Sequence, residues 1–134
     1  MLKKAAFVYD DALARHVLSE EHPLKSVRLR YTYELLKSYG AFEAPNAVVV
    51  SPRPATEKEV LRFHAPAYLD AVKKISRGDR SVDGSAFGFG PGDNPAYAGM
   101  YEAAAWSTGA SLKAVELLMD GAADAVFSIS GGLH

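Results

Sequence analysis

Cysteine is absent from all 134 residues of the sequence. Its absence excludes a disulfide framework, a zinc site built from thiolates and a cysteine nucleophile. Long apolar runs are absent as well. The first ten residues contain two lysines and an apolar run of only five residues, 5–9. A secretion signal needs a longer apolar stretch, and a membrane span needs about 20 residues. We therefore expect a soluble, cytoplasmic protein that does not enter a membrane.

An excess of charge of either sign is also missing. Fifteen lysines and arginines face sixteen aspartates and glutamates, which gives a net charge of −1. Without a basic excess, direct binding of nucleic acid is disfavoured. The glycine cluster at 88–92 lacks the Gly-Lys-Ser/Thr ending of a phosphate-binding loop, so nucleotide binding is disfavoured too. The composition, with 49% hydrophobic and 23% charged residues, is that of one globular domain.

Histidines are few and widely separated. The four lie at positions 16, 22, 64 and 134, with no pair at i,i+4 and no His-x-Glu motif. Metal sites in proteins usually draw on such local clusters. We therefore expect no metal site built within this chain.

Short apolar runs alternate with helical patterns along the chain. Buried strands are predicted over 5–9, 47–50 and 125–129. Helices are predicted over 26–39, 66–76 and 97–119, the last with two glycines inside it. Between the last two helices, residues 78–95 contain five glycines and two prolines without helical periodicity. Loops of this length are usually functional or disordered. Strands separated by helices predict an α/β domain with a parallel sheet.

Several short motifs follow one another in a specific order. In the last third they are Gly-Asp-Asn-Pro at 92–95, Gly-Met-Tyr-Glu at 99–102, Ser-Thr-Gly-Ala-Ser at 107–111 and Ser-Gly-Gly-Leu-His at 130–134. The front half contributes Tyr-Asp at 9–10, His-Pro at 22–23 and Arg28. This ordered set resembles the histone deacetylase family, most closely its bacterial branch that includes acetoin-utilisation proteins.

The resemblance implies a partial arginase/deacetylase-type fold of three layers, in which about three parallel strands lie between helices. Its active site would lie at the carboxyl ends of the strands, as is general for open α/β sheets. In the family, Gly-Gly-Leu-His continues into a second histidine. An Asp-x-His pair and another aspartate, which bind zinc, and a catalytic tyrosine come later. We therefore expect 1–134 to be the N-terminal portion of a deacetylase domain, truncated before the zinc ligands. Such a chain would have no cofactor of its own, while the full-length parent would bind zinc.

Two residues match groups at the reacting end of the substrate. His134 matches the first of the tandem histidines, which lie beside the zinc-bound water and accept a proton or steady charge. A terminal residue without function is the alternative, and without metal or partner the histidine has no chemistry to assist. Asp93 matches the rim carboxylate that accepts hydrogen bonds from the backbone of the acyl-lysine substrate. The alternative is an Asx turn before Pro95.

Three further residues match the walls of the family's pocket. Arg28 matches an arginine of the inner channel through which acetate is thought to leave, and the alternative is a solvated helix face. His22 and Pro23 match residues at the pocket mouth, although His-Pro also makes a plain turn into a helix. His16 and His64 match no functional residue of the family.

The leading hypothesis is thus the N-terminal part of a zinc-dependent deacetylase that removes an acyl group from lysine or a small amine. We expect this chain to be inactive by itself. A second hypothesis is a non-catalytic α/β module that self-associates into a homo-oligomer through an exposed strand edge at 125–129. A third is a small α/β ligand-binding domain that is only distantly related to the family.

Overall fold

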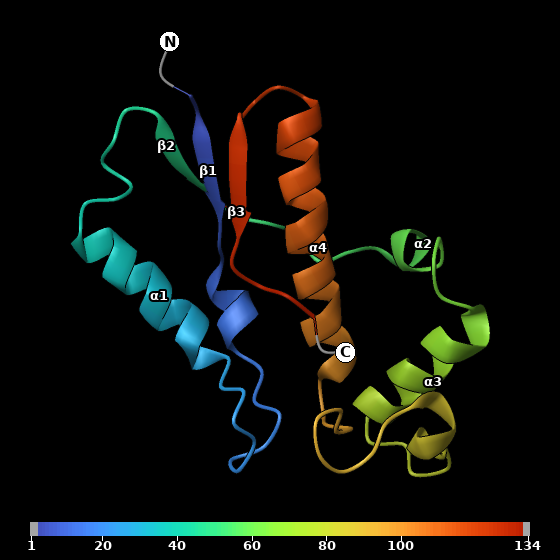
Figure 1. Cartoon of the computed structure of the whole chain (residues 1–134). Coiled ribbons are helices and arrows are strands. Elements are labelled where there is room, and N and C mark those ends of the chain that lie inside the picture. The colour runs from blue at the N-terminus through green and yellow to red at the C-terminus, as the bar shows by residue number, and fades with distance from the viewer. Residues whose placement is uncertain (1–2, 133–134) are drawn as a thin grey trace.

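The computed structural model describes residues 3–132. Helices and strands alternate along the chain, as Figure 1 shows. In order, they are β1 (Ala5–Val8), the 3-10 helix η1 (Asp11–Ala14), α1 (Val27–Ser38), β2 (Ala47–Val50), α2 (Glu57–Val60), α3 (Pro66–Ser76), the 3-10 helix η2 (Gly84–Phe87), α4 (Met100–Met119) and β3 (Ala125–Ser128).

The three strands form one parallel sheet in the order β2-β1-β3. Ala5 of the central strand pairs with Ala47 on one side and with Ala125 on the other. The predicted α/β class, with a parallel sheet between helices, is therefore confirmed. The first and third strands each end one residue before the predicted boundary.

The alternation of side chains along β1 creates two different faces. Phe7 and Tyr9 point toward α1, where the Tyr33 ring stacks on Tyr9 with 4.3 Å between centroids. Val8 points the other way and is fully buried against Ala110 of α4. Because successive residues of a strand face opposite sides, one short strand serves both layers. Figure 1 shows α1 and α4 on opposite sides of the sheet.

Two of the three main helices follow the prediction closely, and the third does not. α3 has the predicted bounds, and α1 begins and ends one residue inside them. α4 begins at Met100, three residues later than predicted, because Gly99 has a φ of +81°. That backbone conformation cannot continue a right-handed helix, so Gly99 is the N-cap and does not lie inside the helix. None of the helices in residues 3–132 is long and apolar enough to cross a membrane.

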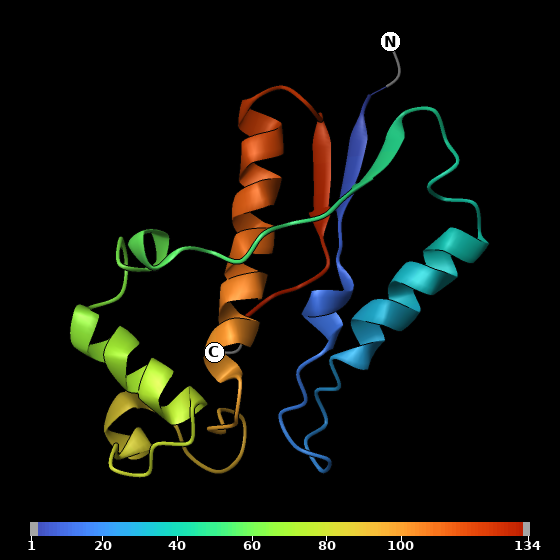
Figure 2. The same ribbon diagram turned by 180° about the vertical axis from the view of Figure 1, so that it is seen from behind.

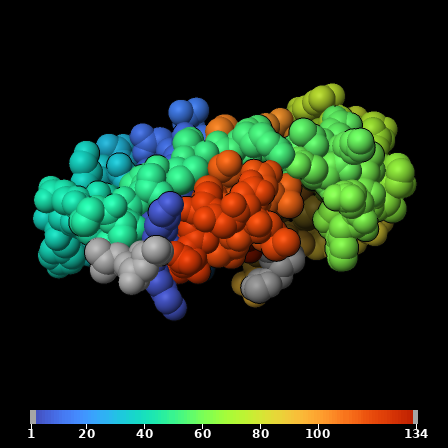
Figure 3. Space-filling view, turned by 90° about the horizontal axis from the view of Figure 1, so that it is seen from above, coloured from blue at the N-terminus to red at the C-terminus, as the bar shows by residue number. Residues whose placement is uncertain are grey.

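The segment that leaves β2 crosses the middle of α4 before it reaches α2 and α3, as Figure 2 shows. The crossing is close because Gly109 has no side chain. A Cβ there would lie 1.8 Å from the carbonyl oxygen of Arg53. The Ala55 amide donates to the Ala105 carbonyl of α4 at 2.8 Å. The crossing therefore puts α3 beyond α4, and Figure 3 shows the α1 and α3 ends of the molecule on opposite sides of the α4–β3 turn.

Candidate functional site

A cavity of about 750 Å³ opens at the carboxyl end of the sheet. Its lining includes Leu13, which follows β1, and residues 129–132, which follow β3. The chain leaves β1 toward β2 on one side and returns as β3 on the other, so the connections diverge between β1 and β3. Ligands of open α/β sheets bind at such switch points. The cavity therefore lies where this type of fold places its binding site.

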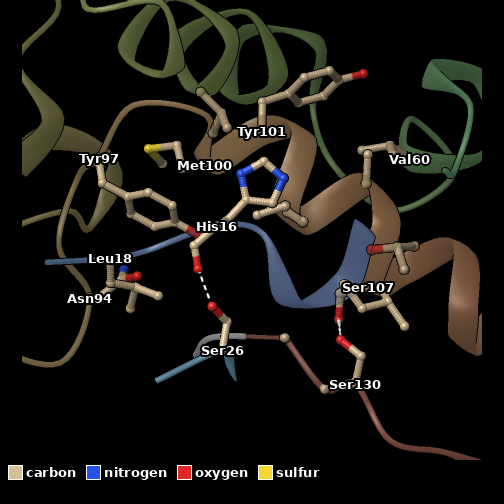
Figure 4. A pocket seen from close by; sticks show the side chains of 18 of the residues that line it. His16, Leu18, Ser26, Val60, Asn94, Tyr97, Met100, Tyr101, Ser107 and Ser130 are labelled. Atoms are coloured by element: carbon tan, nitrogen blue, oxygen red, sulfur yellow. Dashed lines mark hydrogen bonds between the residues drawn. The ribbon is translucent and has the colours of Figure 1, made fainter. Parts of the chain in front are cut away.

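The half-buried His16 occupies the wall of the cavity nearest the start of α4. Figure 4 shows its imidazole between Tyr97, Met100 and Tyr101. Its backbone carbonyl accepts a hydrogen bond from the Ser26 hydroxyl. Burial raises the pKa of the Tyr97 hydroxyl above its ordinary value. The wall thus combines one imidazole, one phenol and apolar surface.

A pair of buried serines holds the segment that follows β3. Ser130 donates to Ser107 of α4 with 3.1 Å between the two hydroxyl oxygens, and Figure 4 shows this bond at the cavity wall. It fixes the chain just before Gly131 and Gly132, which also line the cavity. His134 lies outside the described residues, so its predicted role stays a prediction.

The glycine-rich loop brings Asp93 to the edge of the cavity. Asp93 is exposed, and the next two residues, Asn94 and Pro95, line the cavity. The Asn94 side-chain amide donates to the Gly88 carbonyl at 2.8 Å, and the Gly90 amide donates to the Asn94 carbonyl at 3.0 Å. These two bonds close the loop on itself around Asp93. The Asp93 carboxylate therefore extends from a loop whose backbone is fixed by these hydrogen bonds.

The other predicted site residues lie in the connection from η1 to α1 and in the first turn of α1. Arg28 is exposed on α1 and lines the cavity, and its Nε donates to the Lys25 carbonyl at 3.1 Å. His22 and Pro23 do not contribute to the cavity lining. The Nδ1 of His22 accepts from the Leu24 amide at 3.1 Å. These contacts are those of a turn that leads into α1.

Two histidines for which the sequence indicated no role also line the cavity. His16 reaches it from the loop after η1, and His64 from the turn between α2 and α3, where its ring stacks on Tyr68. No spacing signal marks either residue, because each is brought to the cavity by a long-range connection. Among residues 3–132, no group of three or more His, Cys, Asp or Glu side chains is arranged to hold a metal ion.

The comparison with known proteins bears directly on these residues. A family model described as the histone deacetylase domain matches residues 22–134, which is most of the chain. The chain belongs to the histone deacetylase family. The match covers the segments that contain Arg28, Asp93, the serine pair and His134, and it ends where the sequence ends.

Individual relatives agree with the family match. The acetoin utilization protein AcuC of Bacillus subtilis (strain 168) is 34% identical over 99% of this chain, which corresponds to 34% of that protein. AcuC of Staphylococcus aureus (strain MRSA252) is 32% identical over the same shares. The histone deacetylase RPD3 of Saccharomyces cerevisiae is 27% identical over 98% of the chain and 30% of its own length. The chain thus spans about a third of the length of the curated relatives it matches.

Proposed function

We propose that this chain forms one wall of the active site of a zinc-dependent deacetylase. The substrate would be an acetylated lysine or a small acylated amine, and the bond cleaved would be its amide. In this proposal the zinc ligands are residues outside these 134, and the chain alone is inactive.

One observation carries the proposal. The segments that resemble the family are far apart in sequence, yet they line or border a single cavity: Arg28, the loop around Asp93, Ser107 with Thr108, and 130–132. Residues that served only to stabilise the fold would not need to meet at one opening. Their meeting at the carboxyl end of the sheet supports a shared role in binding one ligand.

Within this wall the residues would have separate roles. Asp93 would accept hydrogen bonds from the substrate backbone, because an exposed carboxylate on a held loop orients a ligand by charge-assisted bonds. Arg28 would bind the departing carboxylate through its guanidinium group. His22 and Pro23, which do not line the cavity among the described residues, would lie at the pocket mouth only in the complete enzyme. His134 would act beside the metal. Zinc, when bound by the complete enzyme, would activate water and polarise the acyl carbonyl.

The alternative of a self-associating, non-catalytic module rests on a different observation. β3 is an end strand of the sheet in the part of the chain that the structure describes, and its Phe127 is 59% exposed. An exposed edge strand is a template for pairing with another chain, and this strand has no proline or lysine that would hinder it. The two proposals are compatible, because self-association describes what the isolated chain would do.

Replacing Asp93 by Ala in the complete gene product tests the role of the loop. We expect kcat/KM on an acetyl-lysine peptide to fall about 100-fold, because the substrate loses its productive orientation. Zinc content should stay at the wild-type level. The matched control is Asp79→Ala, which removes an exposed carboxylate from the same glycine-rich region but not from the cavity edge. Unchanged kinetics for Asp93→Ala would remove this residue from substrate binding.

A further inference from the structure

The loop that carries Asp93 is held at both ends by one buried serine. Ser76 is the last residue of α3 and is only 6% exposed. Its backbone carbonyl accepts a hydrogen bond from the Gly99 amide at 3.1 Å. Gly99 is the N-cap of α4, so this bond joins the residue before the loop to the residue after it. The glycine-rich segment 77–98 is therefore a loop whose two ends are joined by the bond between Ser76 and Gly99.

The hydroxyl of Ser76 makes two more bonds at the same place. It accepts from the Tyr101 amide at 3.1 Å and donates to the Glu102 carboxylate at 2.8 Å. The first amides of a helix have no partner within the helix and are usually capped by a side chain at the N-cap. Gly99 has no side chain to do this. Ser76 thus supplies from α3 the hydroxyl that the N-cap of α4 lacks. Glu102 holds this hydroxyl by accepting its hydrogen bond, whereas the acidic residue of a capping box would accept from the N-cap amide.

Glycine at the N-cap is required by the same arrangement. Gly99 has a φ of +81°, which side-chain-bearing residues rarely adopt. A Cβ there would lie 3.1 Å from Nδ1 of His16. The His16 imidazole therefore lies close to the bare backbone of Gly99, on the wall of the cavity. The hydrogen bond from Ser76, as the largest cause, and a bond from its own backbone amide lower the pKa of the Glu102 carboxyl.

We propose that Ser76 is a positioning residue: its hydroxyl caps α4 across helices and so sets the loop that presents Asp93 to the substrate. The effect of Ser76 on substrate binding rests on the proposed function. Its effect on the loop rests on the structure alone. Gly99, which is bonded to Ser76, lies only six residues after Asp93 in the chain. Pro95 and Tyr97, which lie between them, line the cavity.

Hydrogen exchange on the chain tests the effect on the loop. In Ser76→Ala, the protection of the hydrogen-bonded amides of Gly99, Met100 and Tyr101 should fall about fivefold, as expected from the loss of a helix cap. Glu102→Ala should lower it similarly while Ser76 is still present. The double variant should lose little more than either single variant, because both remove the same unit. Ser76→Thr keeps the hydroxyl and should keep the protection. Ser111→Ala, an exposed serine on the same helix, should change nothing.

Kinetics of the complete gene product test the consequence for substrate. Ser76→Ala should raise KM on an acetyl-lysine peptide several-fold more than it lowers kcat, and Ser76→Thr should restore KM. Unchanged protection in Ser76→Ala, or fully additive single variants, would overturn the proposal. A loosened loop with an unchanged KM would overturn the link to substrate. If the wild-type product has no deacetylase activity, the proposed function fails, while the exchange experiment still decides the role of Ser76 in the loop.

Discussion

Replacing Gly109 by Ala should destabilise the protein, although the same change inside a helix usually stabilises it by about 1 kcal/mol. The reason is the segment after β2, which lies directly on the helix at this residue. The added Cβ would lie 1.8 Å from the Arg53 carbonyl oxygen and 2.9 Å from the Ala55 amide nitrogen. Both neighbours are backbone atoms, so no rotation of a side chain can relieve the clash.

The cost follows from what must move. Overpacking at a buried contact costs about 1–3 kcal/mol, and displacing the segment also breaks the bond from the Ala55 amide to the Ala105 carbonyl, worth about 1 kcal/mol. The ion pair of Arg53 with Glu59, 2.7 Å long, opposes the displacement. After the gain in helix propensity, we expect a net loss of about 1–3 kcal/mol. For a domain of this size the melting midpoint should fall by about 4–12 °C.

Chemical and thermal unfolding, followed by circular dichroism, would measure this change. Ser111→Ala places the same methyl group two residues further along α4 at an exposed position, and it should be neutral or slightly stabilising. If Gly109→Ala is as stable as the wild type, the segment after β2 does not lie against α4 in the way described.

Two further predictions concern the exposed edge of the sheet and the hydrogen bonds made by the Ser76 hydroxyl. Light scattering over a concentration series should show self-association of the chain, which Phe127→Lys on β3 should reduce. A clean monomer at high concentration would contradict the role of the β3 edge. The pKa of Glu102 is lower in the folded protein than in the unfolded chain, with its bond to Ser76 as the largest cause. Its carboxylate therefore stabilises the fold above about pH 4.3, and this contribution is lost on acidification. The stability difference between wild type and Glu102→Gln should accordingly shrink below that pH, and a constant difference from pH 7 to 3 would contradict the assignment.

The sheet was predictable because its strands are short runs of apolar residues that favour extended backbone. The prediction that all three strands are buried holds for β1 only, since β2 and β3 contain no buried residue in the described part of the chain. The parallel arrangement of the strands was predicted from their separation by helices and is confirmed. The predicted start of α4 was wrong because the backbone conformation of a single residue, Gly99, determines where the helix begins. Helical periodicity continues through Tyr97 and Gly99, and only the contacts with His16 and Ser76 show why Gly99 takes a left-handed conformation.

The candidate site was predictable where a motif carries it and not where the fold assembles it. Asp93 and Arg28 stand in recognisable motifs, and the structure brings their segments to one cavity. His16 and His64 stand in no motif. They reach the cavity because the connection between η1 and α1, which contains His16, and the connection between α2 and α3, which contains His64, both lie beside it. Such long-range placement leaves no periodic trace in the sequence.

The central claim is that these residues are one wall of a deacetylase site whose zinc ligands lie elsewhere. Its most direct test compares the 134-residue chain with the complete gene product, each purified and assayed for zinc content and for acetate released from an acetyl-lysine peptide. We expect about one zinc per molecule and turnover in the complete product, and neither in the chain alone. Turnover with stoichiometric zinc in the isolated chain, or a complete product that releases no acetate, would contradict the claim.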